Sequence, residues 1–175
     1  MTAAELVHVE LKRLHQAIDG ALTGLSPEQR HMIVHPKANS IAWVVWHVVR
    51  TEDNVVRFVL QNRRPPVWTE GGYAEKLGLP PVAQGTGMPT AEAHALRLND
   101  VELWSEYARK VWTSADEFFA GAEPALFDKT VTVKPLGDMT VLRALTTVCV
   151  SHNNTHVGEI ELLRTLVGAR PVRDV

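Results

Sequence analysis

The chain contains a single cysteine, Cys149, so an internal disulfide is excluded. It has no uninterrupted stretch of about 18 apolar residues, and a membrane-spanning helix is therefore not expected. Lysine and arginine are not clustered and the formal net charge is −2, which argues against binding to nucleic acid or an anionic membrane. The first residues, MTAAELVHVELKRLHQ, are polar where a signal peptide requires an apolar core. We therefore expect a cytoplasmic protein that acts on a small molecule.

Length and composition suit one domain covering residues 1–175. Of the 175 residues, 45% are hydrophobic and 22% are charged, which is ordinary for a folded domain with a sizeable core. Four stretches carry apolar residues at the three- and four-residue spacing of a helix, and we expect helices over about 3–24, 40–61, 90–121 and 140–167. The sequence thus predicts an all-α protein, an antiparallel four-helix bundle with a long loop between the second and third helices.

Capping residues support these boundaries. Asn39 or Ser40 can cap the second helix, Thr90 the third, and Asp138 or Thr140 the fourth. Between the third and fourth helices, the segment FDKTVTVKPLGDM alternates valine with polar residues and then contains a proline and a glycine. That pattern predicts a short extended segment or a hairpin.

The second predicted helix is apolar on nearly all sides, because Val45, Trp46, Val49 and Val56 lie outside its main apolar face. A helix of this kind is either central in its own domain or shared with a second subunit. We expect a homodimer in which part of this helix, or its neighbour, forms the contact.

The connection from Asn62 to Pro89 is rich in glycine and proline and longer than a simple loop needs to be. Trp68 and Tyr73 indicate that it is ordered, and GGYAEKLG can form a helical turn within it. Two interpretations remain open. The connection is a crossover packed over one end of the bundle, or it is a lid or pocket wall in which Trp68 and Tyr73 contact a substrate.

Polar residues interrupt the apolar stripe of the last helix. At about 100° per residue, His152, His156 and Glu159 fall in one column, which Cys149 and Leu163 extend in the two directions. Two imidazoles one helical turn apart can bind the same ion, so we interpret the pair as metal ligands. Glu159 is a candidate ligand or catalytic base, or else a carboxylate that orients a ligand or lies on the helix surface. Cys149 is more simply a small core residue than a nucleophile.

A third histidine, His47, lies on the corresponding stripe of the second helix. Eight histidines among 175 residues give about 0.3 pairs at this spacing by chance, so the pair alone is weak. Imidazoles from two helices facing the bundle axis complete a three-nitrogen set with positions open for water and substrate. The alternative is that His47, His152 and His156 are core histidines satisfied by hydrogen bonds. The metalloprotease signature is absent, because Asn153 stands where its glutamate is required.

Two sequence blocks resemble a known family. NSIAWVVWHVVRTEDNVV, which contains His47, and SHNNTHVGEIELLR, which contains His152 and His156, resemble the DinB-like superfamily of four-helix-bundle metalloproteins. Helix order extends the resemblance over most of the chain. It implies that the three histidines form a metal triad, that the ion is zinc, nickel or a related divalent ion, and that the chain forms dimers. Members of this superfamily include mycothiol- and bacillithiol-dependent enzymes that catalyse isomerisation and S-transfer, so a low-molecular-weight thiol is a candidate cofactor.

Two more residues of the second helix are candidates for substrate binding. Arg50 and Asn54 flank the column of His47 and carry groups that can bind an anion. Residues of this kind also form hydrogen bonds between helices, and that alternative stays open.

Two classes of function remain. In the first, an ion lowers the pKa of a bound water or thiol, and the chain is a thiol-dependent transferase or isomerase, or a metal-dependent hydrolase. In the second, a non-catalytic dimer holds a metal or a ligand as a stress-response protein. A proton-transfer group beside the ion would favour catalysis, and Glu159 is the only clear candidate.

Overall fold

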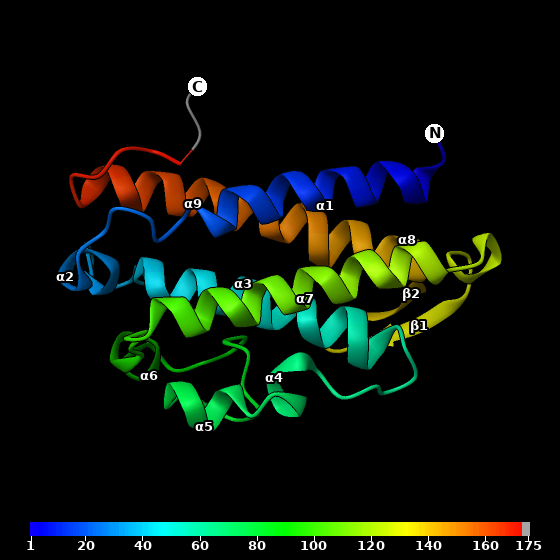
Figure 1. Cartoon of the computed structure of the whole chain (residues 1–175), viewed down its shortest axis with the longest axis horizontal. Coiled ribbons are helices and arrows are strands. Elements are labelled where there is room, and N and C mark those ends of the chain that lie inside the picture. The colour runs from blue at the N-terminus through cyan, green and yellow to red at the C-terminus, as the bar shows by residue number, and fades with distance from the viewer. Residues whose placement is uncertain (173–175) are drawn as a thin grey trace.

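Four long helices form a bundle in the computed structural model, which describes residues 1–172 (Figure 1). Two of the four contain a π-helical segment, so that one continuous rod carries more than one label. The rods are α1 (Ala3–Asp19), α3 (Ile41–Asp53) with η1 (Asn54–Val59), α7 (Val101–Gly121), and α8 (Val141–Ala144) with η3 (Leu145–Ser151) and α9 (His152–Leu166). The all-α bundle predicted from the sequence is confirmed.

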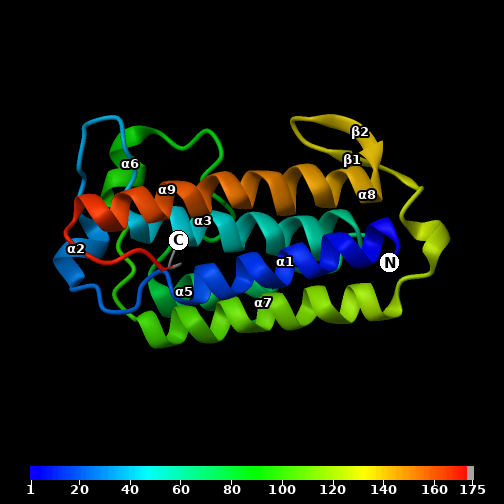
Figure 2. The same ribbon diagram turned by 90° about the horizontal axis from the view of Figure 1, so that it is seen from above.

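The direction of the rods explains the long connection. α1 and the rod that ends in α9 run one way, whereas α3 and α7 run the other way (Figures 1 and 2). The chain must therefore return along the bundle between the end of η1 and the start of α7. α3 packs against both α7 and α9, and α1 packs against the same two helices. This arrangement places α3 and α9 side by side, so that one face of each can contribute to a shared site.

The remaining elements are short. The return connection is ordered and contains α4 (Val67–Glu70), α5 (Tyr73–Leu77) and α6 (Thr90–Ala95). The expected hairpin is present as two antiparallel strands, with Val131 opposite Met139. Its strands are β1 (Thr130–Val133) and β2 (Gly137–Thr140), and the other short helices are α2 (Pro27–His31) and η2 (Pro124–Leu126).

The first helix ends at Asp19, earlier than the expected end near residue 24. The guanidinium of Arg164 donates from Nη1 to the carbonyl oxygens of Ala21 and Thr23. These bonds replace the ones that another helical turn would have supplied. Leu22 is still buried, so the apolar spacing continues where the helix does not.

The third long helix begins at Val101, so the prediction that it begins at Thr90 is wrong. Thr90 lies inside the short α6, and the chain is extended at Leu96. The long helix starts where Asp100 accepts a hydrogen bond from the backbone N–H of Leu103. A side chain that caps the helix here fixes the boundary more strongly than the apolar spacing that runs through it.

At the second and fourth helices, one of the two caps expected from the sequence is present in each case. Ser40 caps α3 by accepting from the N–H of Trp43, and Thr140 caps α8 by accepting from the N–H of Arg143. All 13 residues of α3 are buried within one chain, Trp46 completely. Because the bundle covers α3 unaided, its apolar character does not require a second subunit, and the homodimer stays a prediction without this support.

The core consists of two groups of buried apolar side chains. One surrounds Trp46, Trp104 and Tyr107, and the other surrounds Leu11 and Leu145. Across residues 1–172, none of the helices combines the length and the apolar character needed to cross a bilayer. Against this apolar background, α3 also buries a set of polar side chains, which are His47, Arg50, Thr51, Glu52 and Asp53.

Candidate metal centre

Three histidines from two helices converge on one point. α3 supplies His47, and the first two turns of α9 supply His152 and His156. The Nε2 atom of His152 lies 3.1 Å from Nε2 of His47 and 3.2 Å from Nε2 of His156. Nitrogens bound to one ion at 2.0–2.1 Å in a tetrahedral arrangement lie about 3.3 Å apart. Within residues 1–172, these three histidines form the group of His, Cys, Asp or Glu side chains that could hold an ion, because their ligand atoms all lie within 4.8 Å of one another.

Each of the three imidazoles is held through its other nitrogen. Nδ1 of His47 donates to the carbonyl oxygen of Gln84, and Nδ1 of His156 donates to Oε2 of Glu159 over 2.7 Å. Nδ1 of His152 lies 3.2 Å from Oδ1 of Asn153. With a proton on each Nδ1, all three Nε2 atoms present a lone pair to the same point. Histidine ligands of metals are oriented in this way.

The protonation state also suits a cation. The pKa of His47 is lowered to about 4, mainly by burial and in smaller part by the neighbouring His156 and His152, against the raising effect of the Gln84 carbonyl. Burial likewise lowers the pKa of His152. Both rings are therefore neutral at pH 7, as a ligand must be. Three lone pairs that face one another repel, and a bound cation would remove that repulsion.

A buried chain of hydrogen bonds extends behind His152. Nδ2 of Asn153 donates to Oε2 of Glu52 over 3.1 Å, and Oε1 of Glu52 accepts from Nε2 of His15 over 2.7 Å. The ring of His15 stacks on Trp112 with 5.1 Å between the centroids. Asn153 and Glu52 are at most 1% exposed. This chain links α1, α3 and α9, and it fixes the orientation of the amide that holds His152.

The return connection reaches the centre at Gln84 and Gly85. Gly85 has a φ of +100°, and a Cβ atom built there would lie 2.7 Å from Nδ1 of His47 and 2.8 Å from Cζ2 of Trp43. Only glycine lets the backbone come this close, and this contact brings the Gln84 carbonyl within reach of His47. Gln84 and Gly85 thus lie against the candidate site, whereas Trp68 and Tyr73 of the same connection are completely buried.

Replacing Gly85 with alanine is expected to weaken metal binding by about 10- to 100-fold, the usual effect of losing a partner that orients a histidine ligand. The added methyl group pushes Gln84 away from His47. The control is Gly87→Ala, which has the same kind of strain, with a φ of +71°, but no atom within 4 Å of the added Cβ. Competition with a chromophoric chelator measures both affinities. An equal loss in the two variants would show that backbone strain, and not the contact with His47, is responsible.

A cleft of about 890 Å³ opens beside the triad. His152 lines it, together with Asn54 and Gln84, so the cleft leads directly to one of the three ligands. Residues 132–136, which include the turn between β1 and β2, also line the cleft. A small molecule in this cleft would have access to an ion at the triad.

Comparison with known proteins agrees with the fold. A family model described as the DinB superfamily matches residues 10–160. The chain belongs to the DinB superfamily. A crystal structure of a conserved protein from Enterococcus faecalis superposes with a TM-score of 0.83 at 19% sequence identity, covering 95% of this chain and 98% of that one. At this identity the likeness shows the fold alone. A search of curated proteins finds no match.

Within this DinB bundle, the four predicted substrate-binding residues separate into two groups. Asn54 lines the cleft, whereas Arg50, Trp68 and Tyr73 are at most 3% exposed and do not line it. The guanidinium of Arg50 lies 4.8 Å from the centroid of the Trp68 ring and 3.6 Å from Oδ2 of Asp53. The pair with Asp53 lies within α3, whereas the contact with Trp68 and a 3.4 Å hydrogen bond from Nη2 of Arg50 to the carbonyl oxygen of Val82 hold the return connection against α3.

Asp53 is the centre of a second buried network of polar contacts, which includes Arg50. Its carboxylate accepts from the N–H groups of Val67 and Trp68 over 2.8 and 2.9 Å, and from the hydroxyl of Tyr107 over 3.0 Å. Burial raises the pKa of Asp53, and the two backbone N–H groups oppose that rise. The network anchors α4 to the bundle.

Two other candidates have clear places in the DinB bundle. Glu159 is one-third exposed, and its Oε2 atom is engaged by His156, an arrangement that orients the ring. A role for Glu159 as a catalytic base stays a prediction. Cys149 is completely buried, and burial raises the pKa of its thiol well above the usual value. It is a core residue, as expected.

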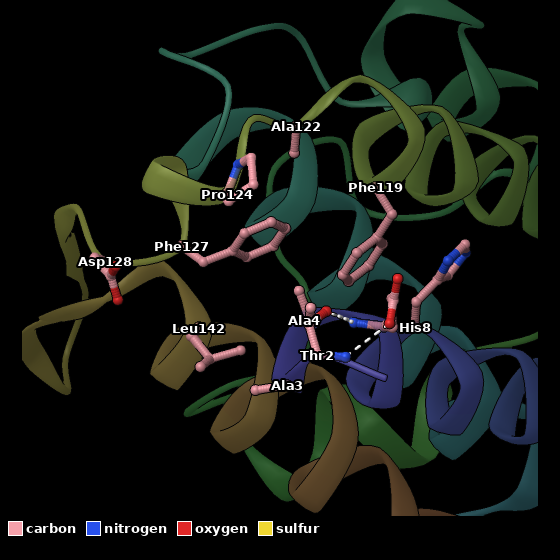
Figure 3. Close-up of a pocket in the computed structure, with 11 residues that line it drawn as sticks. Thr2, Ala3, Ala4, His8, Phe119, Ala122, Pro124, Phe127, Asp128 and Leu142 are labelled. Atoms are coloured by element: carbon pink, nitrogen blue, oxygen red, sulfur yellow. Dashed lines mark hydrogen bonds between the residues drawn. The ribbon is translucent and has the colours of Figure 1, made fainter.

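A smaller pocket of about 380 Å³ lies at the end of the bundle where α1 begins (Figure 3). Phe119, Phe127 and Leu142 surround the hollow, and His8 is hydrogen-bonded to Asp116 over 2.6 Å. None of the triad residues lines this pocket. The cleft beside His152 is therefore the better candidate for a functional site.

Proposed function

We propose that this DinB-superfamily chain is a metal-dependent enzyme that acts on a small molecule, with thiol-dependent S-transfer or isomerisation as the reaction. One observation carries the proposal. His152 belongs both to the convergent triad and to the wall of the open cleft, so the ligand set faces a space large enough for a substrate. A site that only stored metal would not need such an opening.

The donor set fits a divalent transition ion. Three neutral imidazole nitrogens suit zinc and nickel, and they leave further coordination positions for a molecule in the cleft. A bound ion supplies Lewis acidity that lowers the pKa of a coordinated water or thiol. Membership of the DinB superfamily supports a thiol such as mycothiol as the partner in the reaction.

The chain's own residues prepare the site for this chemistry. Gln84, Asn153 and Glu159 each hold one imidazole through its Nδ1, which leaves the three Nε2 atoms free to share an ion. The side chain of Asn54 can donate a hydrogen bond to a substrate in the cleft or accept one from it. Glu159 accepts the Nδ1 proton of His156 in a hydrogen bond, and so orients that ring and would strengthen its Nε2 atom as a ligand.

Cobalt substitution tests the proposal. The cobalt-loaded chain should develop a thiolate-to-metal charge-transfer band when mycothiol or cysteine is added. His156→Ala should abolish the band, while His94→Ala, which changes a histidine bonded to the carbonyl of Ala38, should keep it.

Two results would overturn the thiol-dependent function. Metal-dependent turnover of simple esters or amides, with no band and no need for thiol, would identify a hydrolase. Tight metal binding with neither a band nor turnover would identify a non-catalytic metal-binding protein.

A further inference from the structure

The cleft beside the triad carries charge of one sign. Its lining includes two cationic side chains, Arg63 and Lys134, and no aspartate or glutamate. The chain as a whole has a formal net charge of −2, so the cleft is opposite in sign to the molecule around it. A divalent ion at the triad would add further positive charge. A cleft of this kind attracts anions and focuses their approach.

Neither cation has an acidic partner within residues 1–172. Other arginines of the bundle do: Arg50 pairs with Asp53, Arg57 with Glu70, and Arg109 with Asp19. Single unpaired cations are common on surfaces. Here, two of them come from distant parts of the chain, the end of η1 and the β-hairpin, and line the same cleft.

The backbone holds Arg63 in an uncommon conformation. Asn62 and Arg63 have φ angles of 51° and 63°, two successive left-handed residues that are not glycine. Such residues cost of order 1 kcal/mol or more each and are concentrated at functional sites. The N–H of Arg63 donates to the carbonyl of Phe58 over 2.9 Å, which fixes the turn at the end of η1. The strain is thus maintained at the position where the chain presents a cation to the cleft.

Apolar side chains line the same cleft as His152 and the two cations. Phe58 is 42% exposed and Leu136 is 55% exposed, although both are large and hydrophobic, and both line the cleft. Val55 and Val59 add to this surface. Exposed apolar groups that share a concave site with a few polar ones are typical of small-molecule pockets.

We propose that this cleft binds a small molecule with an apolar body and an anionic group, a carboxylate or a phosphate, and that Arg63 and Lys134 hold the anionic end. The proposal names the substrate class of the site and so rests on the proposed function. The reacting group would lie at His152, the body against Phe58 and Leu136, and the acid at the two cations.

Binding of matched six-carbon probes tests the subsite without any turnover. Hexanoate, hexyl phosphate and hexanol are titrated into the zinc-loaded and the metal-free chain, and NMR shifts report binding. Each anion is expected to bind about 10-fold more tightly than hexanol in both states, because two partly exposed charge contacts contribute about 0.5–1 kcal/mol each. The preference should decrease as salt is added. Comparing hexanoate with hexyl phosphate shows which acid the subsite prefers, and inorganic phosphate alone should bind more weakly than hexyl phosphate.

Charge-matched variants identify the residues. The double variant Arg63→Gln/Lys134→Gln should reduce the preference for the anions to about twofold or less. The control Lys37→Gln/Arg143→Gln makes the same change in net charge at exposed residues outside the cleft and should keep the preference. A preference that survives in the first variant, or is lost equally in both, would overturn the proposal, as would its absence in the unaltered chain. The titrations of the metal-free chain need no ion. Their result therefore does not depend on the outcome of the cobalt–thiol experiment.

Discussion

Replacing His152 with alanine is expected to lower the affinity for zinc or nickel by more than about 100-fold, a larger effect than the loss of an orienting partner. His152 is the middle ligand: its Nε2 atom lies within 3.2 Å of both other Nε2 atoms. Its removal leaves His47 and His156 without a common neighbour on the cleft side. Chelator competition and elemental analysis after dialysis measure the change.

Two comparisons make this result specific. His47→Ala and His156→Ala should also weaken binding strongly, whereas His94→Ala should not, because the ring of His94 bonds to the carbonyl of Ala38 away from the triad. Unchanged affinity in His152→Ala, or an equal loss in His94→Ala, would mean that the ion binds elsewhere.

Replacing Asp53 with asparagine is expected to lower the free energy of unfolding by about 3–5 kcal/mol, the usual cost of leaving a buried charge without its partner. Asp53 is fully buried, and Arg50 beside it is 3% exposed. Asparagine removes the negative charge, and its amide group cannot accept from both Val67 and Trp68. In a chain of this size the loss corresponds to a decrease in Tm of about 10 °C.

The matched control is Asp19→Asn. Asp19 pairs with Arg109 at the surface, where the side chains are 37% and 66% exposed. An exposed pair contributes less than about 1 kcal/mol, so this variant should unfold close to the unaltered chain. If urea titration gives equal stabilities for the two variants, the network around Asp53 does not anchor α4 as the contacts indicate.

The triad could be found from the sequence because its signal is local. His152 and His156 lie one turn apart on an apolar stripe, and His47 lies on the stripe of another long helix. Helical geometry alone places these residues on inward-facing sides. The resemblance to the DinB superfamily then joined the two helices, which the spacing could not do. The structure brings the resulting set of three together in one group that could hold an ion.

The partners that orient the triad could not be found in this way, because they depend on contacts distant in sequence. Gln84 acts through its backbone carbonyl, so its side-chain chemistry gives no signal. Gly85 looks like any other glycine of a loop, and its role appears only when the loop is placed on His47. Glu52 did offer a signal, since an acidic residue inside an apolar helix needs a buried partner.

Helix boundaries show a similar division. The caps at Ser40 and Thr140 follow from one residue and its neighbours, and each is one of the two alternatives that the sequence offers at its helix. The break before Asp100 was missed, because the apolar spacing continues through it while the chain is extended. The π-helical segments η1 and η3 were also missed, since they shift the phase of a helix without changing which residue types it contains.

The meeting of α3 and α9 at one point also bears on how long the folded chain persists. His47 and His152 are 105 positions apart, so an ion bound to both would cross-link two distant parts of a chain that cannot form a disulfide. A cross-link that closes about 100 residues stabilises a fold by about 4.7 kcal/mol on the chain-entropy account. Unlike a disulfide, this one forms and dissolves with the concentration of free metal. Resistance to unfolding and to proteolysis would then follow the supply of that metal, and the steady-state amount of the protein would report it.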